Sequence, residues 1–427
     1  MTTDSAALPR TALRPRTPLW TVVTAAVAAL TTVTAGAAPP ASSRGGDVVL
    51  EWYDATAATI AAGGPEAQLT GDRTWAISWL SAARALRSGP HSPDFQDAAL
   101  ASAVHTSLAG LIPAGADGLD AALAATLDRI PDGPAKDQGV AAGTARAAEL
   151  LAERAGDGFD PASIDPPYPP PAPEPGIWQP TPPAYGPAEQ AGTRHARPFL
   201  LEHADLFRPE PPPALGSARY RADLAEVRAY GAADSLVRTP EQTENAQFWL
   251  DSPQLIYTEV VRAALAAVSE PLPAQAELVA LFHVALVDTQ IATSDAKYAY
   301  LRWRPVTAIR SADVDGDPAT DPDPDWAPLH ATPSHPEYPS AHGTYAGAAE
   351  QVLTALVGAR AAGPFTVTSL TAPGVIRTYT TWKELTDENV DARVWSGIHT
   401  RSADEAGATL GRRVAADTLR NSARLFP

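Results

Sequence analysis

The sequence DAKYAYLRWRPVTAIR, residues 295–310, lies at the end of a helix that the hydrophobic pattern predicts over residues 274–300. Pro305 has no amide hydrogen and disfavours helical geometry in the residue before it, so helical structure should end at about Arg304. Lys297 and Arg304 are seven residues apart, and a continuing helix would place both cationic heads on one face. Taken alone, the segment is more simply interpreted as a solvated basic helix end that the helix dipole favours.

Helical patterns also extend on both sides of this segment. Residues 48–156 are rich in Ala and Leu, with Trp75, Trp79, Ala82 and Leu86 on one stripe and turns at 112–113 and 130–134. Further helices are expected at 219–231, 240–249, 254–269, 343–358 and 402–425. The only weak strand signal lies within 364–381. We therefore predict an all-α fold of two helical bundles, at residues 38–160 and 219–427.

A proline-rich connection, residues 161–218, joins the two predicted bundles. It carries 17 of the 43 prolines, all before residue 214, and should be extended and partly polyproline II. Trp178, Phe199, Leu200 and Phe207 interrupt it and indicate that it packs over the surface of the protein.

Composition limits the classes of function. The 427 residues carry 32 Lys+Arg against 49 Asp+Glu, a formal charge of −17, which argues against binding nucleic acid or an anionic membrane. With no Cys, the chain can form neither disulfides nor thiolate metal sites, and it has no Cys nucleophile. A hydrophobic content of 45% allows a sizeable core.

Residues 1–37 have the pattern of an export signal. Arg10, Arg14 and Arg16 precede an uncharged, largely apolar stretch that ends at Ala35-Gly36-Ala37, a small-x-small cleavage pattern. A membrane anchor is the alternative, although several Thr residues dilute the stretch. Cleavage would remove three Arg and one Asp, leaving a formal charge of −19. We expect a secreted protein without stable membrane association.

A second segment, HPEYPSAHG, spans residues 335–343 and precedes an Ala-rich helix. Ser340 is a plausible N-cap, which places the free N–H groups of the first turn near Ala341 and His342. A helix N-terminus with a hydroxyl and an imidazole can bind an anion. Alone, the segment fits a simple capped helix with a half-exposed histidine.

A third segment, ARVWSGIHT, spans residues 392–400 and places Arg393 six residues before His399. The glycine between them breaks regular structure, so the two side chains can converge from a turn and from the start of the next helix. Considered together, the three segments supply one Lys, two Arg, two His and a helix N-terminus. Permanent cations and N–H donors in this number describe a site for a tetrahedral oxyanion.

The order and spacing of these residues resemble a known three-part pattern. Lys-x6-Arg-Pro, Pro-Ser-x-His and Arg-x5-His are typical of the vanadium-dependent haloperoxidases and the related type-2 phosphatidic-acid phosphatases. The resemblance covers roughly residues 48–424 and is strongest to the secreted bacterial haloperoxidase-like proteins, whose cores are helical bundles. It implies vanadate as cofactor, with hydrogen peroxide, a halide and a small organic acceptor as reaction partners. The absence of Cys, and of Met after Met1, suits an enzyme that releases a strong oxidant.

The resemblance also implies a role for each matching residue. Lys297, Arg304 and Arg393 would grip the equatorial oxygens of vanadate, and Ser340 with the N–H of Ala341 would add hydrogen bonds.

The two histidines would have different roles. His399 would bind vanadium axially, whereas His342 would take a proton from incoming peroxide. Lys297 would then polarise the bound peroxide, so that a halide attacks it and hypohalous acid forms.

Several positions depart from the pattern. Ala341 stands where the family usually has Gly, and Ala392 replaces the usual Ser. The phosphatases carry an Asp that orients a nucleophilic His at the position of Ala403, whereas here Asp404 is one residue later. This departure weakens the phosphatase interpretation. Phosphate-ester hydrolysis and oxyanion binding without turnover nevertheless stay open.

His335 and Ser294 occupy positions beside the expected halide pocket where related proteins carry Phe and Trp. A wetter, polar wall should favour bromide and iodide over chloride, and an imidazole there can titrate between pH 5 and 8. Alternatively, His335 packs against Trp303 or Trp395 and never meets the halide. A separate acidic loop, residues 313–325, resembles the start of a Ca²⁺ site but lacks the EF-hand spacing. Dimer formation is left open.

Overall fold

The computed structural model describes residues 46–63 and 67–426, so the predicted export signal at 1–37 lies outside the described residues. These residues belong to one compact unit, Ser43–Pro427. Its central element is helix α10, Leu272–Tyr300. This helix is long and apolar enough to cross a membrane, yet 89% of its most apolar window is buried inside the protein. It is therefore a core helix.

The N-terminal helices agree with the prediction for residues 48–156. They are α1 (Gly46–Ala62), α2 (Ala67–Arg87), α3 (Pro93–Leu111), α4 (Ala116–Asp128) and α5 (Pro134–Glu153). The expected turns separate α3 from α4 and α4 from α5. The predicted stripe on α2 is fully buried, and Trp75 stacks on His283 of α10 with ring centroids 4.8 Å apart. The apolar stripe thus joins the N-terminal helices to α10.

The proline-rich connection contains only the short helix α6 (Pro161–Ile164) and a 3₁₀ turn, Thr193–His195. Trp178 is fully buried and Leu200 nearly so, as the sequence indicated. The carboxylate of Asp288, on α10, accepts the N–H groups of Phe199, Leu200 and Leu201 at 2.7–2.9 Å. A buried charge on the central helix therefore holds the connection in place.

The described part of the C-terminal half contains seven further α-helices. They are α7 (Ala218–Tyr230), α8 (Pro240–Phe248), α9 (Pro253–Ala267), α11 (Pro305–Arg310), α12 (Ala341–Leu356), α13 (Trp382–Trp395) and α14 (Arg401–Asn421). Strands β1 (Arg360–Val367) and β2 (Arg377–Thr381) form an antiparallel hairpin that overlaps the weak strand signal at 364–381 and begins four residues before it. The described residues are thus mainly helical, which confirms the predicted fold class.

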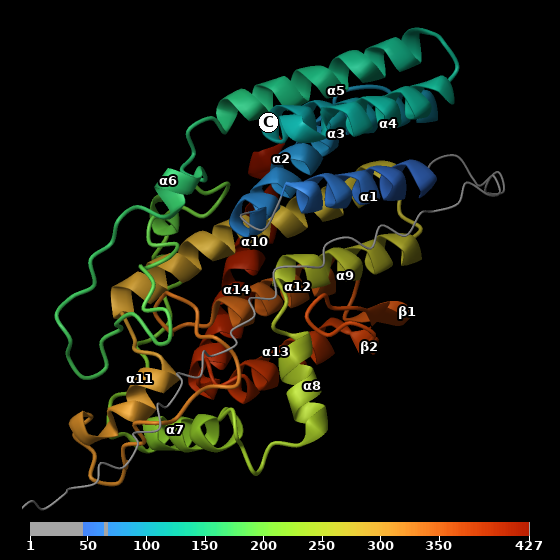
Figure 1. Cartoon of the computed structure of the whole chain (residues 1–427). Helices are drawn as coiled ribbons and strands as arrows, with labels where there is room; N and C mark the ends of the chain where they lie inside the picture. The colour runs from blue at the N-terminus through green and yellow to red at the C-terminus, as the bar shows by residue number, and fades with distance from the viewer. Residues whose placement is uncertain (1–45, 64–66, 427) are drawn as a thin grey trace, which may run out of the picture. The chain divides into compact units, whose positions relative to one another are not determined.

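Both helical halves share one hydrophobic core, in which buried side chains extend from Val48 to Leu425. Helix α10 packs against α2 from the first half and against α12 and α14 from the second (Figure 1). The domain boundaries at residues 160 and 218 stay predictions.

Helices α12 and α14 pack in very close contact through glycines. A Cβ atom added at Gly347 would lie 2.1 Å from the carbonyl oxygen of Ala408, and one at Gly411 would lie 2.0 Å from that of Thr344. Neither position can carry a larger side chain without moving the backbone. This contact brings the N-terminus of α12 beside the start of α14, where two of the three motif segments meet.

Candidate functional site

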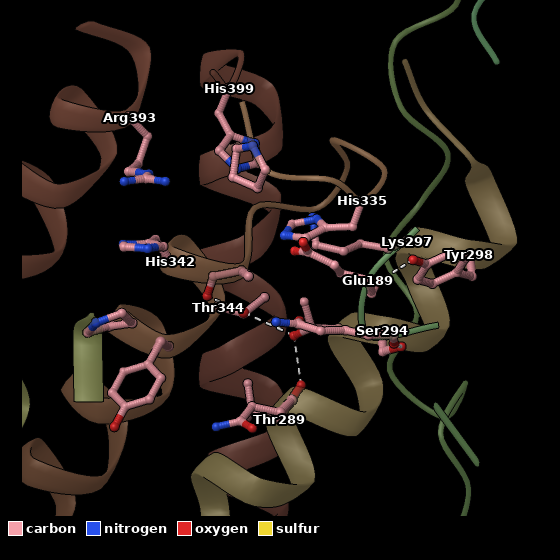
Figure 2. A pocket seen from close by; sticks show the side chains of 17 residues that line it. Glu189, Thr289, Ser294, Lys297, Tyr298, His335, His342, Thr344, Arg393 and His399 are labelled. Atoms are coloured by element: carbon pink, nitrogen blue, oxygen red, sulfur yellow. Dashed lines mark hydrogen bonds between the residues drawn. The ribbon is translucent and has the colours of Figure 1, made fainter. Parts of the chain in front are cut away.

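A cavity of about 230 Å³ lies where the last turns of α10 meet the N-terminus of α12. Figure 2 shows Lys297, His335, His342, Arg393 and His399 around it, although they come from three separate segments of the chain. The complete lining is Glu189, Gln190, Pro253, Thr289, Gln290, Thr293, Ser294, Lys297, Tyr298, Pro333, His335, Ala341, His342, Thr344, Tyr345, Arg393 and His399. All three sequence segments therefore contribute to one site.

Lys297 lies in the last turn of α10 and is 2% exposed. Its Nζ donates to the carbonyl oxygens of Pro336 at 2.7 Å and Glu337 at 3.1 Å. Because an ammonium has three donors, one remains for a bound anion.

Arg304 is completely buried, so its interpretation as part of a solvated helix end was wrong. Helix α10 ends at Tyr300 and Leu301 adopts a left-handed conformation, with φ 49°. The chain then turns before Arg304, which caps the next helix, α11. The expectation that Lys297 and Arg304 share one continuing helix face was therefore also wrong. They approach the same site from two different elements.

The guanidinium of Arg304 supports the cavity wall without lining the cavity itself. Its Nε donates to the carbonyl oxygen of His335 at 2.8 Å, and its Nη2 lies 3.0 Å from Nδ1 of the same residue. Its Nη1 donates to the carbonyl oxygen of Ile398 at 2.9 Å and lies 3.2 Å from Nε2 of His399. One buried cation thus positions two cavity histidines.

Ser340 is the N-cap of α12, as predicted, and its Oγ accepts the N–H of Gly343 at 3.3 Å. Ala341 and His342 follow it and line the cavity. Their N–H groups lie in the first turn, where a helix provides no carbonyl acceptors of its own. The positive end of the helix dipole therefore faces the site from this side. Ala392 is buried in α13 and does not line the cavity.

Arg393 and His399 converge from opposite sides of a turn. Arg393 lies near the end of α13, a helix that the sequence analysis did not predict, and its Nη1 donates to the carbonyl oxygen of Trp249 at 3.0 Å. After α13 ends, Gly397 adopts a positive φ of 78°, and a Cβ there would lie 2.3 Å from the carbonyl oxygen of Gly231. Only glycine fits this turn, which returns His399 to the cavity just before α14 begins.

The three cations of the site lack carboxylate partners. In the described part of the chain neither Lys297, Arg304 nor Arg393 forms an ion pair, and Nε of Arg393 has no hydrogen-bond partner. Burial lowers the pKa of Arg304 to about 9 and that of Arg393 to about 10, and it lowers the pKa of Lys297 well below its usual value. Buried cations that oppose one another need an anion, and the cavity between them is where an anion fits.

The histidines of the site are neutral in the anion-free protein. Burial, followed by the charges of the neighbouring cations, holds the pKa of His335, His342 and His399 well below 6.5. The expectation that His335 titrates between pH 5 and 8 therefore does not hold without a bound anion. A neutral imidazole keeps one nitrogen lone pair, which can bind a metal or accept a proton.

The two halide-side candidates both line the cavity. His335 is 7% exposed and its ring contacts Arg304. Ser294 donates from Oγ to the carbonyl oxygen of Gln190 at 2.8 Å. This hydrogen bond ties α10 to the proline-rich connection, so that Gln190 and Glu189 of the connection close one wall of the cavity.

Several residues near the site were not singled out from the sequence. The polar wall of Thr289, Gln290 and Thr293 could have been found only by counting turns back from Lys297 along α10. Glu337 was visible inside the second segment, but no local signal placed its carboxylate beside a histidine. Asp404 is fully buried, and neither of its carboxylate oxygens has a hydrogen-bond partner.

Two carboxylates of the acidic loop, residues 313–325, are bound by other groups of the protein. Oδ1 of Asp315 accepts the N–H of Asp317 at 2.7 Å, and Oδ2 of Asp317 pairs with Arg221 at 2.7 Å. In residues 46–63 and 67–426 no group of three or more His, Cys, Asp or Glu could hold a metal ion.

Comparisons with known proteins identify proteins of similar fold. Residues 277–427 match the family model described as "VCPO second helical-bundle domain". A solved bacterial vanadium-dependent iodoperoxidase is similar in fold, with a TM-score of 0.75 and 22% identity over 90% of this chain and 98% of that chain. A bacterial vanadium-dependent chloroperoxidase in its holo form has a TM-score of 0.67 and 17% identity, over 85% and 93% of the two chains. No curated protein sequence matches significantly.

Proposed function

We propose that this protein is a vanadate-dependent haloperoxidase, because residues 277–427 match the family model of the VCPO second helical-bundle domain. The observation that supports the proposal most strongly is the set of three buried, unpaired cations around a cavity that a helix N-terminus also faces. Such a set fits vanadate, a small tetrahedral anion with about two negative charges near neutral pH.

Each residue that would hold vanadate has a donor or a lone pair for it. Lys297 and Arg393 would contribute free N–H donors and positive charge. Arg304 does not line the cavity and would contribute positive charge from its position against His399. The first-turn N–H groups at Ala341 and His342 would bind further oxygens, together with the hydroxyl of Ser340. The neutral imidazole of His399 would be the ligand to the metal, through Nε2.

When bound, vanadate supplies a Lewis-acidic centre that activates hydrogen peroxide toward attack by a halide. The residues of this chain prepare the reactants for that chemistry. His342, which is neutral and has an unpartnered Nδ1, accepts a proton from hydrogen peroxide as the peroxide enters. The remaining donor of Lys297 would supply positive charge to the oxygens of the bound anion. Halide, hydrogen peroxide and one proton then give hypohalous acid and water.

The polar lining supports bromide or iodide as the preferred halide. Ser294, Thr289 and Thr293 present hydroxyl groups, and His335 presents an imidazole. Such a wall keeps chloride well hydrated, whereas bromide and iodide are easier to oxidise and tolerate a less activating site. The hypohalous acid would leave the cavity and halogenate a small organic acceptor. We further propose that residues 1–37 export the protein, so that this oxidant forms outside the cell.

Phosphate-ester hydrolysis is a second candidate, because a specific observation favours it. A histidine nucleophile needs a carboxylate to orient it, and Oε1 of Glu337 lies 3.8 Å from Nδ1 of His399 although Ala403 replaces the usual Asp.

Vanadate distinguishes the two candidates. We would titrate vanadate into the vanadate-free protein and measure bromination of a reporter diketone with hydrogen peroxide, and separately hydrolysis of an aryl phosphate. A haloperoxidase gains bromination as vanadate binds. A phosphatase hydrolyses the ester without vanadate and loses that activity when vanadate is added, which would overturn the proposal.

A further inference from the structure

Glu337 lies in the second sequence segment, between His335 and His342, and its carboxylate is buried, with the residue 2% exposed. We propose that Glu337 is the positioning residue for His399: its carboxylate holds the imidazole proton on Nδ1 and leaves Nε2 free to bind the central atom of the oxyanion. The inference rests on the proposed binding of an oxyanion at this site. It assigns a role that none of the three sequence motifs carries.

The contacts of His399 determine its tautomer. Nη1 of Arg304 lies 3.2 Å from Nε2, and a guanidinium can only donate hydrogen bonds. This contact favours Nε2 as the acceptor, and it therefore favours the single proton of the neutral ring on Nδ1. That Nδ1 is buried and has no hydrogen-bond partner closer than the carboxylate. A buried N–H donor requires an acceptor.

Glu337 provides the nearest carboxylate to this proton. Its Oε1 lies 3.8 Å from Nδ1 of His399, and both side chains are almost completely buried. The same oxygen accepts the N–H and the hydroxyl of Thr400, at 2.6 and 2.8 Å. Because Thr400 directly follows His399, the carboxylate is anchored to the backbone that carries the ring. A shift of less than 1 Å would bring Nδ1–H and Oε1 to hydrogen-bonding distance.

The backbone of Glu337 is equally constrained. Its carbonyl oxygen accepts from Nζ of Lys297, and its N–H donates to the carbonyl oxygen of Arg302 at 2.9 Å. Burial raises the pKa of the Glu337 carboxyl above its usual value, and the hydrogen bonds from Thr400 and the charges of Arg302 and Arg304 oppose this rise. Glu337 thus connects the amine of Lys297 to the imidazole of His399. Replacing its carboxylate should change the orientation of His399 more than it changes the positions of the cations.

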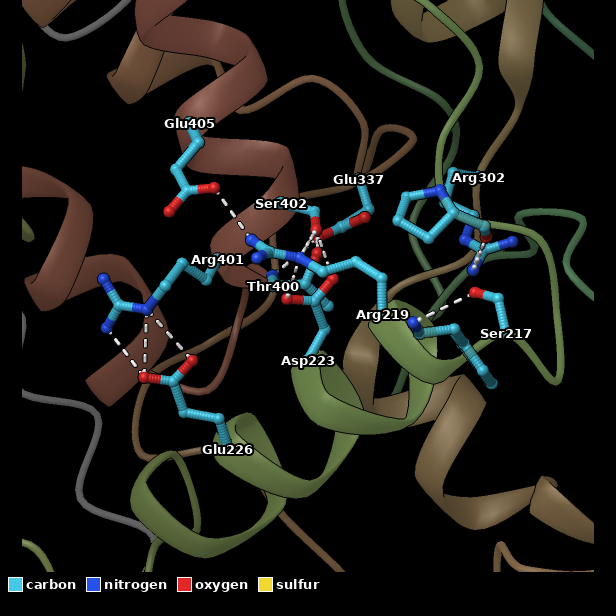
Figure 3. Close-up of polar contacts among 12 residues, drawn as sticks. Ser217, Arg219, Asp223, Glu226, Arg302, Glu337, Thr400, Arg401, Ser402 and Glu405 are labelled. Atoms are coloured by element: carbon cyan, nitrogen blue, oxygen red, sulfur yellow. Dashed lines mark hydrogen bonds and ion pairs between the residues drawn. The ribbon is translucent and has the colours of Figure 1, made fainter.

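Figure 3 shows the other side of Glu337, where a polar cluster contains Asp223, Ser402 and Arg219. Asp223 is also a buried carboxylate and borders the same small cavity as Glu337, but it bonds to Ser402 and has no contact with His399. Asp223→Asn is therefore a matched control, since it removes a neighbouring buried charge without touching the histidine.

The test uses Glu337→Gln, which preserves volume and removes the charge. In the vanadate-free protein labelled with ¹⁵N-histidine, the parent should show His399 protonated at Nδ1, whereas the variant should show a mixture of both tautomers. Vanadate affinity should fall about tenfold, while affinity for inorganic phosphate, held by the cations alone, should change less than about threefold. Asp223→Asn should behave as the parent in all three measurements.

Three results would overturn the inference: an unchanged His399 tautomer, an equal loss of vanadate and phosphate affinity, or the same effects in Asp223→Asn. Thr400→Val provides a second variant, because it removes only the hydroxyl that orients Oε1. It should shift the tautomer in the same direction by a smaller amount, and it keeps the inference testable if Glu337→Gln fails to fold. None of these measurements uses halide turnover. A protein without haloperoxidase activity that shows them would contradict the proposed function and retain the positioning role.

Discussion

Arg304 and His399 lie 95 residues apart in sequence, yet Nη1 of the arginine is 3.2 Å from Nε2 of the histidine inside the protein core. A buried cation without a carboxylate within ion-pairing distance is unfavourable unless an anion compensates its charge. The contact therefore supports binding of an anion in the adjoining cavity, beside this cation, the imidazole of His399 and the N-terminus of α12.

Replacing Arg393 by Ala should weaken vanadate binding at least tenfold, about 1.4 kcal/mol. The guanidinium is 3% exposed and carries an unpartnered Nε, so it has both charge and a donor to offer an anion in a protein whose overall charge is negative. Calorimetric titration of vanadate into the variant measures the loss. Arg420→Ala, at a position on α14 outside the cavity, is the control. Near-parental affinity in Arg393→Ala would remove Arg393 from the binding site.

The two cavity histidines should differ in what they lose. His399→Ala should bind little vanadate and show no activity, because it lacks the proposed metal ligand. His342→Ala should retain measurable vanadate binding while losing peroxide-dependent turnover, because it lacks only a proton acceptor. Vanadate binding and bromination measured side by side separate the two roles. Parental vanadate affinity in both variants would show that the assignment of His399 as the vanadium ligand is wrong.

Halide preference should depend on His335. The parent should oxidise bromide and iodide with little activity toward chloride, because its cavity wall is polar. His335→Phe removes the imidazole that contacts Arg304 and should change the ratio of kcat/KM values for bromide and chloride, or the pH profile of turnover. Chloride turnover equal to bromide turnover in the parent would contradict the prediction. No change in His335→Phe would instead support the alternative that this ring never meets the halide.

Stability of the vanadate-free protein should decrease in mild acid, and His330 should contribute. Burial, then the charge of Arg393, lowers the pKa of His330 from 6.5 to about 4. Between these two pKa values the unfolded chain binds more protons at His330 than the folded protein does. The contribution of His330 to the free energy of unfolding is therefore complete above pH 6.5 and is lost as the pH falls toward 4.

Calorimetric Tm values at neutral and acidic pH test this linkage. His330→Gln should lose less Tm on acidification than the parent, whereas His91→Gln, at an exposed position, should lose as much as the parent. An identical pH dependence in parent and His330→Gln would show that His330 is not involved.

The sequence predicted the helices with clear apolar periodicity and the N-cap at Ser340, because those features depend on neighbouring residues. The sequence did not predict helix α13, whose residues WKELTDENVDARVW are mostly polar. That helix depends on a capping box between Thr381 and Glu384 and on burial of one face, neither of which dominates the pattern. Local periodicity alone could not distinguish it from a loop.

The residue types of the site were predicted, but their surroundings were not. Pro305 correctly predicted an interruption, whereas the left-handed turn at Leu301 that sends Arg304 into the core has no sequence signature. The wall formed by Glu189 and the approach of Glu337 to His399 both depend on how distant segments pack. Contacts of this kind follow from tertiary structure and cannot be obtained from spacing.

The most direct test of the central claim is the stoichiometry of activation by vanadate. With hydrogen peroxide and bromide in excess, the bromination rate of the vanadate-free protein should rise with added vanadate and saturate at one vanadate bound per chain, and His399→Ala should show no rise. A bromination rate that is independent of vanadate, or one that rises equally in His399→Ala, would contradict the account.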